Sequence, residues 1–196
     1  MQINKLPLKQ LFEISQGISL SRYKTELGEI TKPIVQIRNL SYPFVESDLE
    51  EVRLSVSDVK RYELKKDDIV VAHRGPEMKA SVVSEDTVGS LAGQNLLSMR
   101  PKPGEGLDSL YVAVILRSQW MDRTLAGLYS TTVGTKMITI SDLSNLQFPV
   151  PDLKIQRKIA ELFLYAEETA KLTLKIIETR KNLIEAILID MLEEDG

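Results

Sequence analysis

The chain of 196 residues contains no cysteine and a single histidine, His73. Without cysteine it can form neither a disulfide framework nor a cysteine zinc site, and one histidine cannot build a multi-histidine metal site. No apolar run reaches the roughly 18 residues that a membrane span needs, and the N-terminus lacks a basic-then-apolar leader. We therefore expect a soluble, cytoplasmic protein without a metal of its own.

The sequence also lacks the common signatures of catalysis. It has no GxxxxGK[ST] phosphate-binding loop, no recognisable carboxylate pair and no nucleophile elbow. His73 follows the strongest predicted strand, but no acid or nucleophile at a recognisable spacing supplies the partner that a catalytic histidine needs. An enzyme centred on His73 is therefore the least favoured alternative, and we predict a protein without catalytic activity.

Charge gives little direction by itself. The net charge is -3, and residues 151–196 carry seven Lys or Arg against ten Asp or Glu, which leaves 18 of each sign in residues 1–150. Four acids of that first part gather in one segment, namely Glu46, Asp48, Glu50 and Glu51. A neutral domain can still present a basic face when its acids lie elsewhere. The composition thus permits a nucleic-acid partner without indicating one.

Residues 1–150 mix short strand patterns with helical ones. A short amphipathic segment begins at Leu6 and is closed by Gly17, and a polar loop overlaps its end at residues 15–29. Apolar runs bounded by Gly, Pro or polar turns predict strands at 34–37, 68–72, 81–83, 95–99, 136–140 and 146–150. Apolar spacing near 3.6 predicts one helix over 110–125. Short strands with interspersed helices indicate an α+β fold.

The last fifth of the chain predicts a single long helix. No Pro or Gly occurs between Pro151 and Gly196, and Asp152 is a good N-cap residue. At about 1.5 Å per residue such a helix is about 60 Å long, which exceeds what one compact domain can bury. We therefore favour pairing with another chain over a helix folded back on its own domain.

A heptad pattern runs along this helix. Spacings of four and three residues alternate, as in a coiled coil, and continue through Arg180 and Met191. The predicted dimerisation residues are Ile159, Phe163, Ala166, Ala170, Thr173, Ile177, Ile184 and Ile187. A second stripe lies beside this seam and consists of Leu162, Thr169, Ile176 and Leu183. The apolar face is thus wider than a two-stranded seam requires.

Several predicted loops carry residues suited to nucleic acid. Arginine reads guanine, and asparagine or glutamine reads adenine, through paired hydrogen bonds, whereas hydroxyls, backbone N–H groups and lysine suit phosphate oxygens. The candidate DNA-binding residues are Arg22, Tyr23, Lys24, Arg38, Asn39, His73, Arg74, Lys79, Gln94, Asn95, Thr131, Thr132, Thr135 and Lys136. Each group of these residues also occurs in ordinary loops, so the prediction rests on their combination.

The order of these pieces resembles the specificity subunit of type I restriction–modification enzymes. The matching segments are 8–17, 33–40, 64–75, Gln94 and Asn95 with Arg100 and Pro101 behind them, 134–136, 138–143, and 148–151 with Gln156 and Ile159. Two departures lie where the helix begins: Asp152 stands where the family often has a second proline, and Ile155 stands where it often has glutamate.

The resemblance implies a target-recognition domain over residues 1–150 and a spacer and dimerisation helix over residues 151–196. It implies no cofactor of its own and partners that are double-stranded DNA and adenine-N6 methyltransferase subunits, which use S-adenosylmethionine; restriction subunits can join. Usual members carry two recognition domains and two helices, so we expect this chain to be a half-subunit that reads a bipartite site as a homodimer. The alternative is a coiled-coil interaction or regulatory protein, such as a decoy of the same system, without DNA readout.

Overall fold

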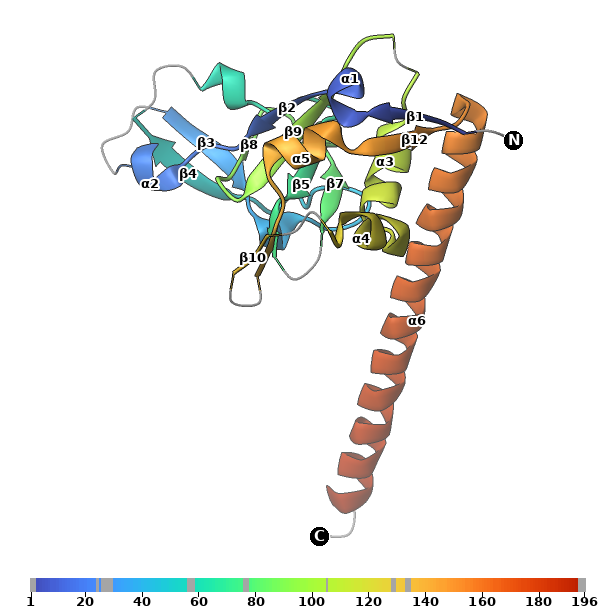
Figure 1. Cartoon of the computed structure of the whole chain (residues 1–196). Coiled ribbons are helices and arrows are strands. Elements are labelled where there is room, and N and C mark those ends of the chain that lie inside the picture. Colours follow the sequence, from blue (N-terminus) through green and yellow to red (C-terminus); the bar gives the residue numbers. More distant parts are fainter. Residues whose placement is uncertain are drawn as a thin grey trace. The chain divides into compact units, whose positions relative to one another are not determined.

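The computed structural model describes residues 3–23, 25, 30–55, 59–75, 78–104, 106–127, 130–132 and 135–193, and only the backbone of 130–132, 135, 136 and 193. Contacts divide the chain into two units, Met1–Ala160 and Glu161–Gly196. Strands and short helices form the first unit, and the long helix α6 (Leu153–Glu193) continues into the second (Figure 1). The predicted α+β class and the long terminal helix are confirmed.

A four-stranded antiparallel sheet forms the centre of the first unit. Its strands, in spatial order, are β2 (Phe12–Gln16), β9 (Leu96–Pro101), β5 (Ile69–Ala72) and β7 (Ala80–Val82). Alternate side chains of β5 enter two different cores, with Ile69 and Val71 on one face and Val70 and Ala72 on the other. Burial on both faces explains why β5 is a continuous apolar run.

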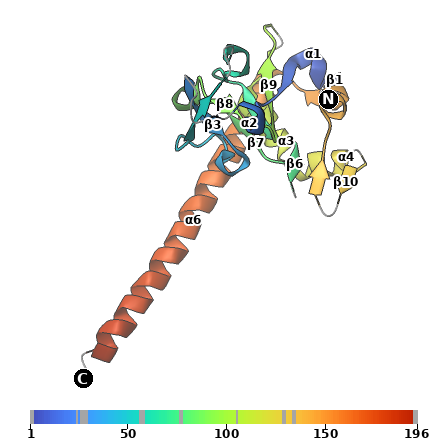
Figure 2. The same cartoon turned by 90° about the vertical axis from the view of Figure 1, so that its left-hand side faces the viewer.

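Three smaller sheets surround this centre. One contains, in spatial order, β4 (Glu50–Leu54), β3 (Ile30–Val35) and β8 (Leu91–Ala92). Another contains β10 (Ser130–Thr132), β11 (Thr135–Met137) and β6 (Arg74–Gly75). The third pairs β1 (Asn4–Pro7) with β12 (Gln147–Val150). Strand β3 pairs with β4 antiparallel and with β8 parallel. Figure 2 shows β6 close to β10, in agreement with their shared sheet.

Polar side chains cap the longer helices. The remaining helices are α1 (Leu8–Leu11), α2 (Leu20–Tyr23), α3 (Ser109–Leu116), α4 (Gln119–Leu125), α5 (Ile140–Asn145) and the 3-10 turns η1 (Ile37–Asn39), η2 (Lys60–Tyr62) and η3 (Glu85–Thr87). Asp108 accepts the N–H of Tyr111 at 3.0 Å, Thr139 that of Asp142 at 3.1 Å, and Asp152 that of Ile155 at 3.1 Å. Each cap satisfies a donor that a helix start leaves open, and the predicted start of α6 at Asp152 is confirmed.

Five predicted segments need correction. The strand predicted over 34–37 is β3, which ends at Val35 because Ile37–Asn39 form η1. The helix predicted over 110–125 is two helices, because Ser118 takes an extended conformation and its Oγ accepts the N–H of Met121 at 3.3 Å. The strand predicted over 136–140 ends at Met137, because Thr139 caps α5. Residues 8–17 form α1 and then β2, and the predicted polar loop 15–29 contains α2. No sequence pattern predicted β1, β4, β6, β8 or β10.

One ion pair of the first unit, between Arg100 and Asp68, contains a buried carboxylate. Arg100 donates from Nη2 to Asp68 Oδ2 at 2.7 Å and from Nε to Oδ1 at 3.0 Å, and Asp68 is only 1% exposed. Asp68 also accepts the N–H of Lys65 at 2.8 Å, and Arg100 donates to the Glu63 carbonyl at 2.9 Å. The hydrogen bond to Asp68 raises the pKa of Arg100. This pair ties β5 to β9 at the polar end of both strands.

The first two turns of α6 belong to the core of the first unit. Ala160 is 3% exposed, and Ile159 packs against the main apolar cluster. Gln156 is fully buried: its Nε2 donates to Gly106 O at 3.1 Å and Pro151 O at 2.9 Å, and its Oε1 accepts the N–H of Asp108 at 3.0 Å. Both ends of this amide are therefore hydrogen-bonded to neighbouring backbone groups.

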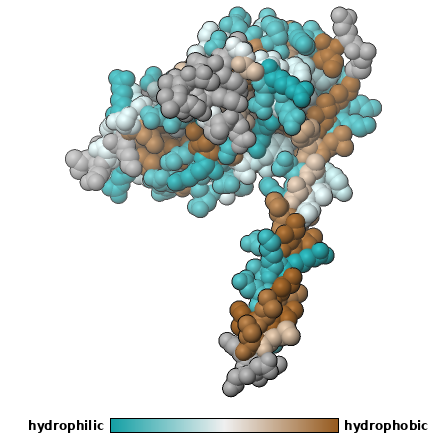
Figure 3. All heavy atoms as spheres, turned by 60° about the horizontal axis from the view of Figure 1, so that its bottom comes forward, coloured by the Kyte–Doolittle hydropathy of each residue, from teal (hydrophilic) through white to brown (hydrophobic). Residues whose placement is uncertain are grey.

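Beyond Ala160 the same helix keeps its apolar side chains exposed. Phe163 is 45% exposed, Ile177 46% and Ile184 60%. Figure 3 shows apolar side chains gathered along α6. None of the helices in the described ranges combines the length and the apolar character of a membrane span. Exposed apolar side chains that gather on one element are typical of an interaction surface.

Candidate nucleic-acid interface

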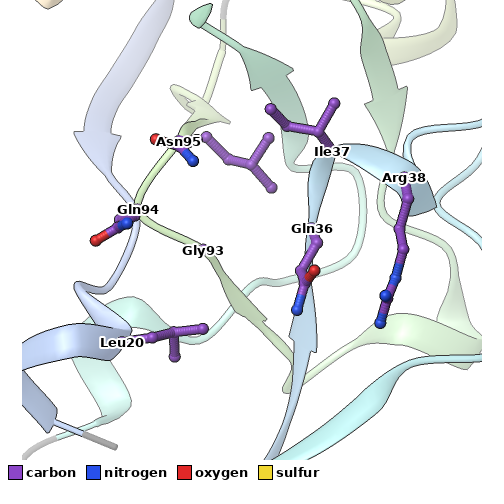
Figure 4. Close-up of a pocket in the computed structure, with 8 residues that line it drawn as sticks. Leu20, Gln36, Ile37, Arg38, Gly93, Gln94 and Asn95 are labelled. Carbon is purple, nitrogen blue, oxygen red and sulfur yellow. The ribbon is translucent and has the colours of Figure 1, made fainter.

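A hollow of about 340 Å³ lies between three segments that are distant in sequence. Its lining residues are Leu20, Gln36, Ile37, Arg38, Gly93, Gln94, Asn95 and Leu96. Figure 4 shows Gln94 and Asn95 across the hollow from Gln36 and Arg38. The fold thus brings together two of the predicted base-reading motifs.

Arg38 lies on the rim of this hollow with 64% of its side chain exposed. Its Nη2 donates to Glu50 Oε2 at 3.1 Å, and Gln36 Nε2 donates to the same oxygen at 3.3 Å. A solvent-exposed pair of this kind adds little stability. The guanidinium can therefore exchange Glu50 for another acceptor at low energetic cost. Arg38 is thus able to bind a ligand at the rim of the hollow.

Asn39 has a different environment from its neighbour. It is 4% exposed, its Oδ1 accepts the N–H of Gln36 at 2.9 Å, and its Nδ2 donates to Asp48 O at 3.3 Å. Both ends of the amide thus hold the backbone of the loop that carries Arg38. We assign Asn39 this supporting role, because so little of its side chain is accessible to a ligand.

Gln94 and Asn95 form the turn between β8 and β9, and both side chains are exposed. We call these two residues the 94–95 turn. His73 lies directly against it: its Nε2 is 3.5 Å from the carbonyl oxygen of Gln94, and its backbone N–H donates to Asn95 O at 3.4 Å. His73 is 8% exposed, so it contacts the turn and is largely hidden from solvent.

The hydroxyl-rich segment lies on the other side of His73. The carbonyl of His73 accepts the N–H of Ile138 at 3.0 Å, directly after β11. Arg74, which is exposed, lies in β6 opposite Met137, and Gly75 lies opposite Lys136. The backbone of the candidates Thr131, Thr132, Thr135 and Lys136 forms the β10–β11 hairpin, and their side chains are outside the described part of the structure. Histidine and hairpin are thus joined through the main chain.

The remaining candidates are spread around these elements. Arg22 is exposed, with its guanidinium 5.4 Å from the ring centre of Tyr23. Tyr23 packs against the apolar cluster beneath β3 and β4. Lys24 lies outside the described residues. Lys79 is half-buried, and its carbonyl accepts the N–H of Ala72 at 2.8 Å.

Four polar residues of this region were not among the candidate DNA-binding residues predicted from the sequence. Gln36 and Glu50 lie beside Arg38, and Gln16 and Ser19 lie beside the 94–95 turn. Gln36 could have been predicted, since it lies two residues before the candidate Arg38. The other three are brought in by strand pairing, which no local signal indicates. Among the described residues no group of three or more His, Cys, Asp or Glu could hold a metal ion.

The family model for the type I restriction modification DNA specificity domain matches residues 3–186. A match over most of the chain shows the family, and this chain belongs to it. The family resemblance predicted from the sequence is confirmed. The fold, with its mixed sheets and long terminal helix, agrees with this membership.

Individual relatives are distant in sequence. A candidate type I restriction enzyme MjaX specificity subunit of Methanocaldococcus jannaschii is 24% identical over 168 residues, which cover 79% of this chain and 37% of that protein. The crystal structure of the HsdS subunit from Thermoanaerobacter tengcongensis superimposes with a TM-score of 0.59 at 19% identity, over 85% of this chain and 37% of that one.

A second solved structure gives the same result. The type I restriction-modification system S subunit from M. genitalium matches with a TM-score of 0.56 at 18% identity, over 93% of this chain and 43% of that one. At these identities the likeness establishes the fold. The chain spans roughly two fifths of the length of the relatives it matches.

Proposed function

We propose that this chain recognises DNA sequence for a type I restriction–modification system and carries no catalytic activity or cofactor of its own. The observation that carries the proposal is the convergence of Arg38 and the 94–95 turn around one hollow, within a fold of the specificity family. An exposed guanidinium and exposed amides are the side chains that read base edges in the major groove. These side chains would supply sequence readout.

Phosphate contacts would come from the sheet beside His73. Arg74 is exposed on β6, and Lys136 lies on the adjoining strand of the same sheet. Cations and backbone N–H groups of this kind position a protein on the duplex without reading its sequence. Residues of the hollow would contact base edges, and residues of the β10–β11 hairpin would contact the DNA phosphates.

The exposed part of α6 would join the recognition domain to its partners. We propose that one copy pairs with a second copy through the seam that contains Phe163, Ala170 and Ile177, which leaves the stripe of Leu162, Ile176 and Leu183 for methyltransferase subunits. These subunits would supply S-adenosylmethionine and the methyl transfer to adenine. A two-fold dimer would read a palindromic, bipartite site, because the symmetry of the protein is mirrored in its target.

The length of α6 limits the distance between the two half-sites. A helix of 41 residues extends about 60 Å, which corresponds to roughly 18 base pairs of B-DNA at about 3.4 Å each. The centres of the two half-sites should lie no farther apart than this. A longer spacing in the target would exclude direct pairing of two copies along their helices.

Salt-dependent DNA binding tests the recognition role. The protein with its methyltransferase subunits should bind target DNA with an affinity that falls steeply with salt, and the double variant Arg74→Ala, Lys136→Ala should lower the logarithmic salt slope by about 2, because each phosphate contact contributes about 1. Unchanged slope and affinity would exclude these two residues from the interface.

A second candidate function is a coiled-coil interaction protein, such as a decoy or regulator of the same system. The exposed apolar residues of α6 favour it, since they require a partner whether or not DNA is bound. This candidate predicts self-association and methyltransferase binding without preference for any DNA sequence. Binding to target DNA compared with binding to unrelated DNA of the same length, at one salt concentration, therefore separates the two functions.

A further inference from the structure

We propose that the 94–95 turn is the element that discriminates bases, and that Gln16, Ser19 and His73 are positioning residues that hold it. This inference rests on the proposed function, because it assigns the reading of bases to one part of the surface. Three separate sets of contacts fix the turn and leave its side chains exposed. The ligand that fits these side chains is a base edge rich in hydrogen-bond acceptors.

The backbone on either side of the turn is held by close packing of main chains. Gly17 donates its N–H to Leu96 O at 3.0 Å, and Ile18 donates to Ala92 O at 2.7 Å. A Cβ added at Gly17 would lie 2.1 Å from Gly93 O, so only glycine permits this approach. The chain at residues 17 and 18 therefore lies directly against the base of the turn.

A second strand holds the turn from the opposite direction. Gly93 donates its N–H to Val35 O at 2.9 Å, where β8 pairs with β3 in parallel. Gln36 follows Val35 directly, Arg38 lies two residues further on, and both line the same hollow. The two sides of the hollow are thus connected by main-chain hydrogen bonds, which fix their separation.

Side chains hold Gln94 itself. Its carbonyl accepts from Gln16 Nε2 at 3.2 Å and lies 3.5 Å from His73 Nε2, and its side-chain Oε1 accepts from Ser19 Oγ at 3.3 Å. Gln16 and His73 thus hold the main chain of Gln94, and one hydrogen bond from Ser19 restricts the rotamer of its exposed side chain. A fixed side chain loses less conformational entropy when a ligand binds.

The pattern of contacts selects the chemistry of the ligand. Since Ser19 occupies Oε1, the Nε2 of Gln94 is the end left to donate, and the guanidinium of Arg38 across the hollow donates as well. Donors on both sides of one hollow favour the acceptor edge of a purine, which offers N7 in adenine and both N7 and O6 in guanine. Asn95 adds an amide whose side chain has no hydrogen bond to any described residue.

The test is a selection from a duplex library randomised over both half-sites, with the full chain in the presence of its methyltransferase subunits. The double variant Gln94→Ala, Asn95→Ala removes the reading side chains. Gln16→Ala and Ser19→Ala remove supports at exposed or half-buried positions, where folding is not at risk, and Ser19→Thr retains the hydroxyl. Gln119→Ala, an exposed glutamine at the start of α4, is the matched control.

We expect the double variant to lower the preference for the best purine by about tenfold at one part of each half-site. The support variants should lower that preference by about threefold, with an unchanged salt slope, and Ser19→Thr should restore it. The control should select the wild-type motif.

The inference is overturned if the wild-type protein selects a motif that the double variant selects equally well. It is also overturned if the support variants weaken binding to every sequence alike. Selection of no motif by the wild-type protein would remove the proposed function as well, so the two failures are distinguishable.

Discussion

The two units of the chain deal with apolar surface in opposite ways. In Met1–Ala160 the large apolar residues are mostly buried, in clusters on both faces of the central sheet, whereas in Glu161–Gly196 residues such as Leu172, Ile176 and Ile184 are more than half exposed. Burial of apolar area is the main source of folding free energy. The first unit therefore holds itself together, and we infer that the second needs another molecule to cover it.

The two units also differ in where their polar side chains find hydrogen-bond partners. The first unit uses long-range contacts, such as Arg100 with Asp68, which lie 32 residues apart. The helix satisfies its hydroxyls locally: Thr173 Oγ1 donates to Thr169 O at 2.8 Å, four residues earlier. A threonine bonded in this way turns its hydroxyl inward to its own helix. Thr173 can therefore sit in an apolar seam without a polar partner from another chain.

The largest expected effect is the loss of self-association when the seam of α6 is disrupted. Ala170→Glu should convert a dimer into a monomer by light scattering, with an association constant lower by roughly a hundredfold or more, because an uncompensated charge in an apolar interface costs about 3–5 kcal/mol. Thermal unfolding of the first unit should not change. Asn182→Glu adds the same charge outside the seam and should remain dimeric. If Ala170→Glu stays dimeric at the same concentrations, the predicted seam is wrong.

The next effect concerns the first unit alone. Arg100→Met removes the partner of a carboxylate that is 1% exposed, and the free energy of unfolding in urea should fall by about 3–5 kcal/mol. Self-association should be unaffected. Lys66 forms a comparable contact with Glu85 at 2.6 Å on the surface, so Lys66→Met should leave the unfolding midpoint unchanged. Equal effects of the two substitutions would contradict the importance that we give to burial.

A smaller expected effect on stability tests whether the first turns of α6 belong to the first unit. Gln156→Leu leaves the part-buried Asp108 N–H without its partner, and the free energy of unfolding should fall by about 1–3 kcal/mol. The neighbouring Arg157 is exposed on the same helix, so Arg157→Ala should have no measurable effect. Similar stability of both variants in chemical denaturation would show that the first turns of α6 do not belong to the core.

The smallest effect depends on pH. Burial raises the pKa of Tyr111 to about 12, against about 10 in the unfolded chain. Between these values the unfolded state loses its proton first, so the stability of the wild-type protein should fall as pH rises, by at most about 1.4 kcal/mol per pH unit from this group.

Tyr111→Phe cannot ionise at this position, and it also loses the 3.0 Å hydrogen bond to Pro149 O. The variant should be less stable than the wild type by about 1 kcal/mol below pH 10, and the difference should shrink as pH rises above that value. Denaturant titrations across this range provide the measurement. A constant difference would show that the phenol is not shielded from solvent.

Local patterns were enough to predict much of this architecture. The apolar run of β5, the proline-marked β12 and the N-cap Asp152 of α6 each carry their signal within a few residues. Ser118 carried the same kind of signal as a cap between α3 and α4, and it was missed because apolar periodicity continued across it. These successes and this error all concern interactions within a single element.

Contacts between distant segments account for what the sequence did not reveal. Gln16 and Gln94 are 78 residues apart, and they meet only because β2 pairs with β9 in a particular register. The parallel pairing of β3 with β8, which brings Arg38 toward the 94–95 turn, likewise has no local signature. The candidate residues could therefore be named from sequence, but their grouping around one hollow and the supporting role of Asn39 required the fold.

A map of N6-methyladenine in the source genome, with and without this gene, tests the central claim most directly. We predict that removal of the gene abolishes methylation at one bipartite motif and that the motif is palindromic, as a symmetric pair of identical chains requires. An asymmetric motif would require a different second recognition half in place of the identical copy. An unchanged methylation map, in cells that express the chain and its methyltransferase, would contradict the recognition function.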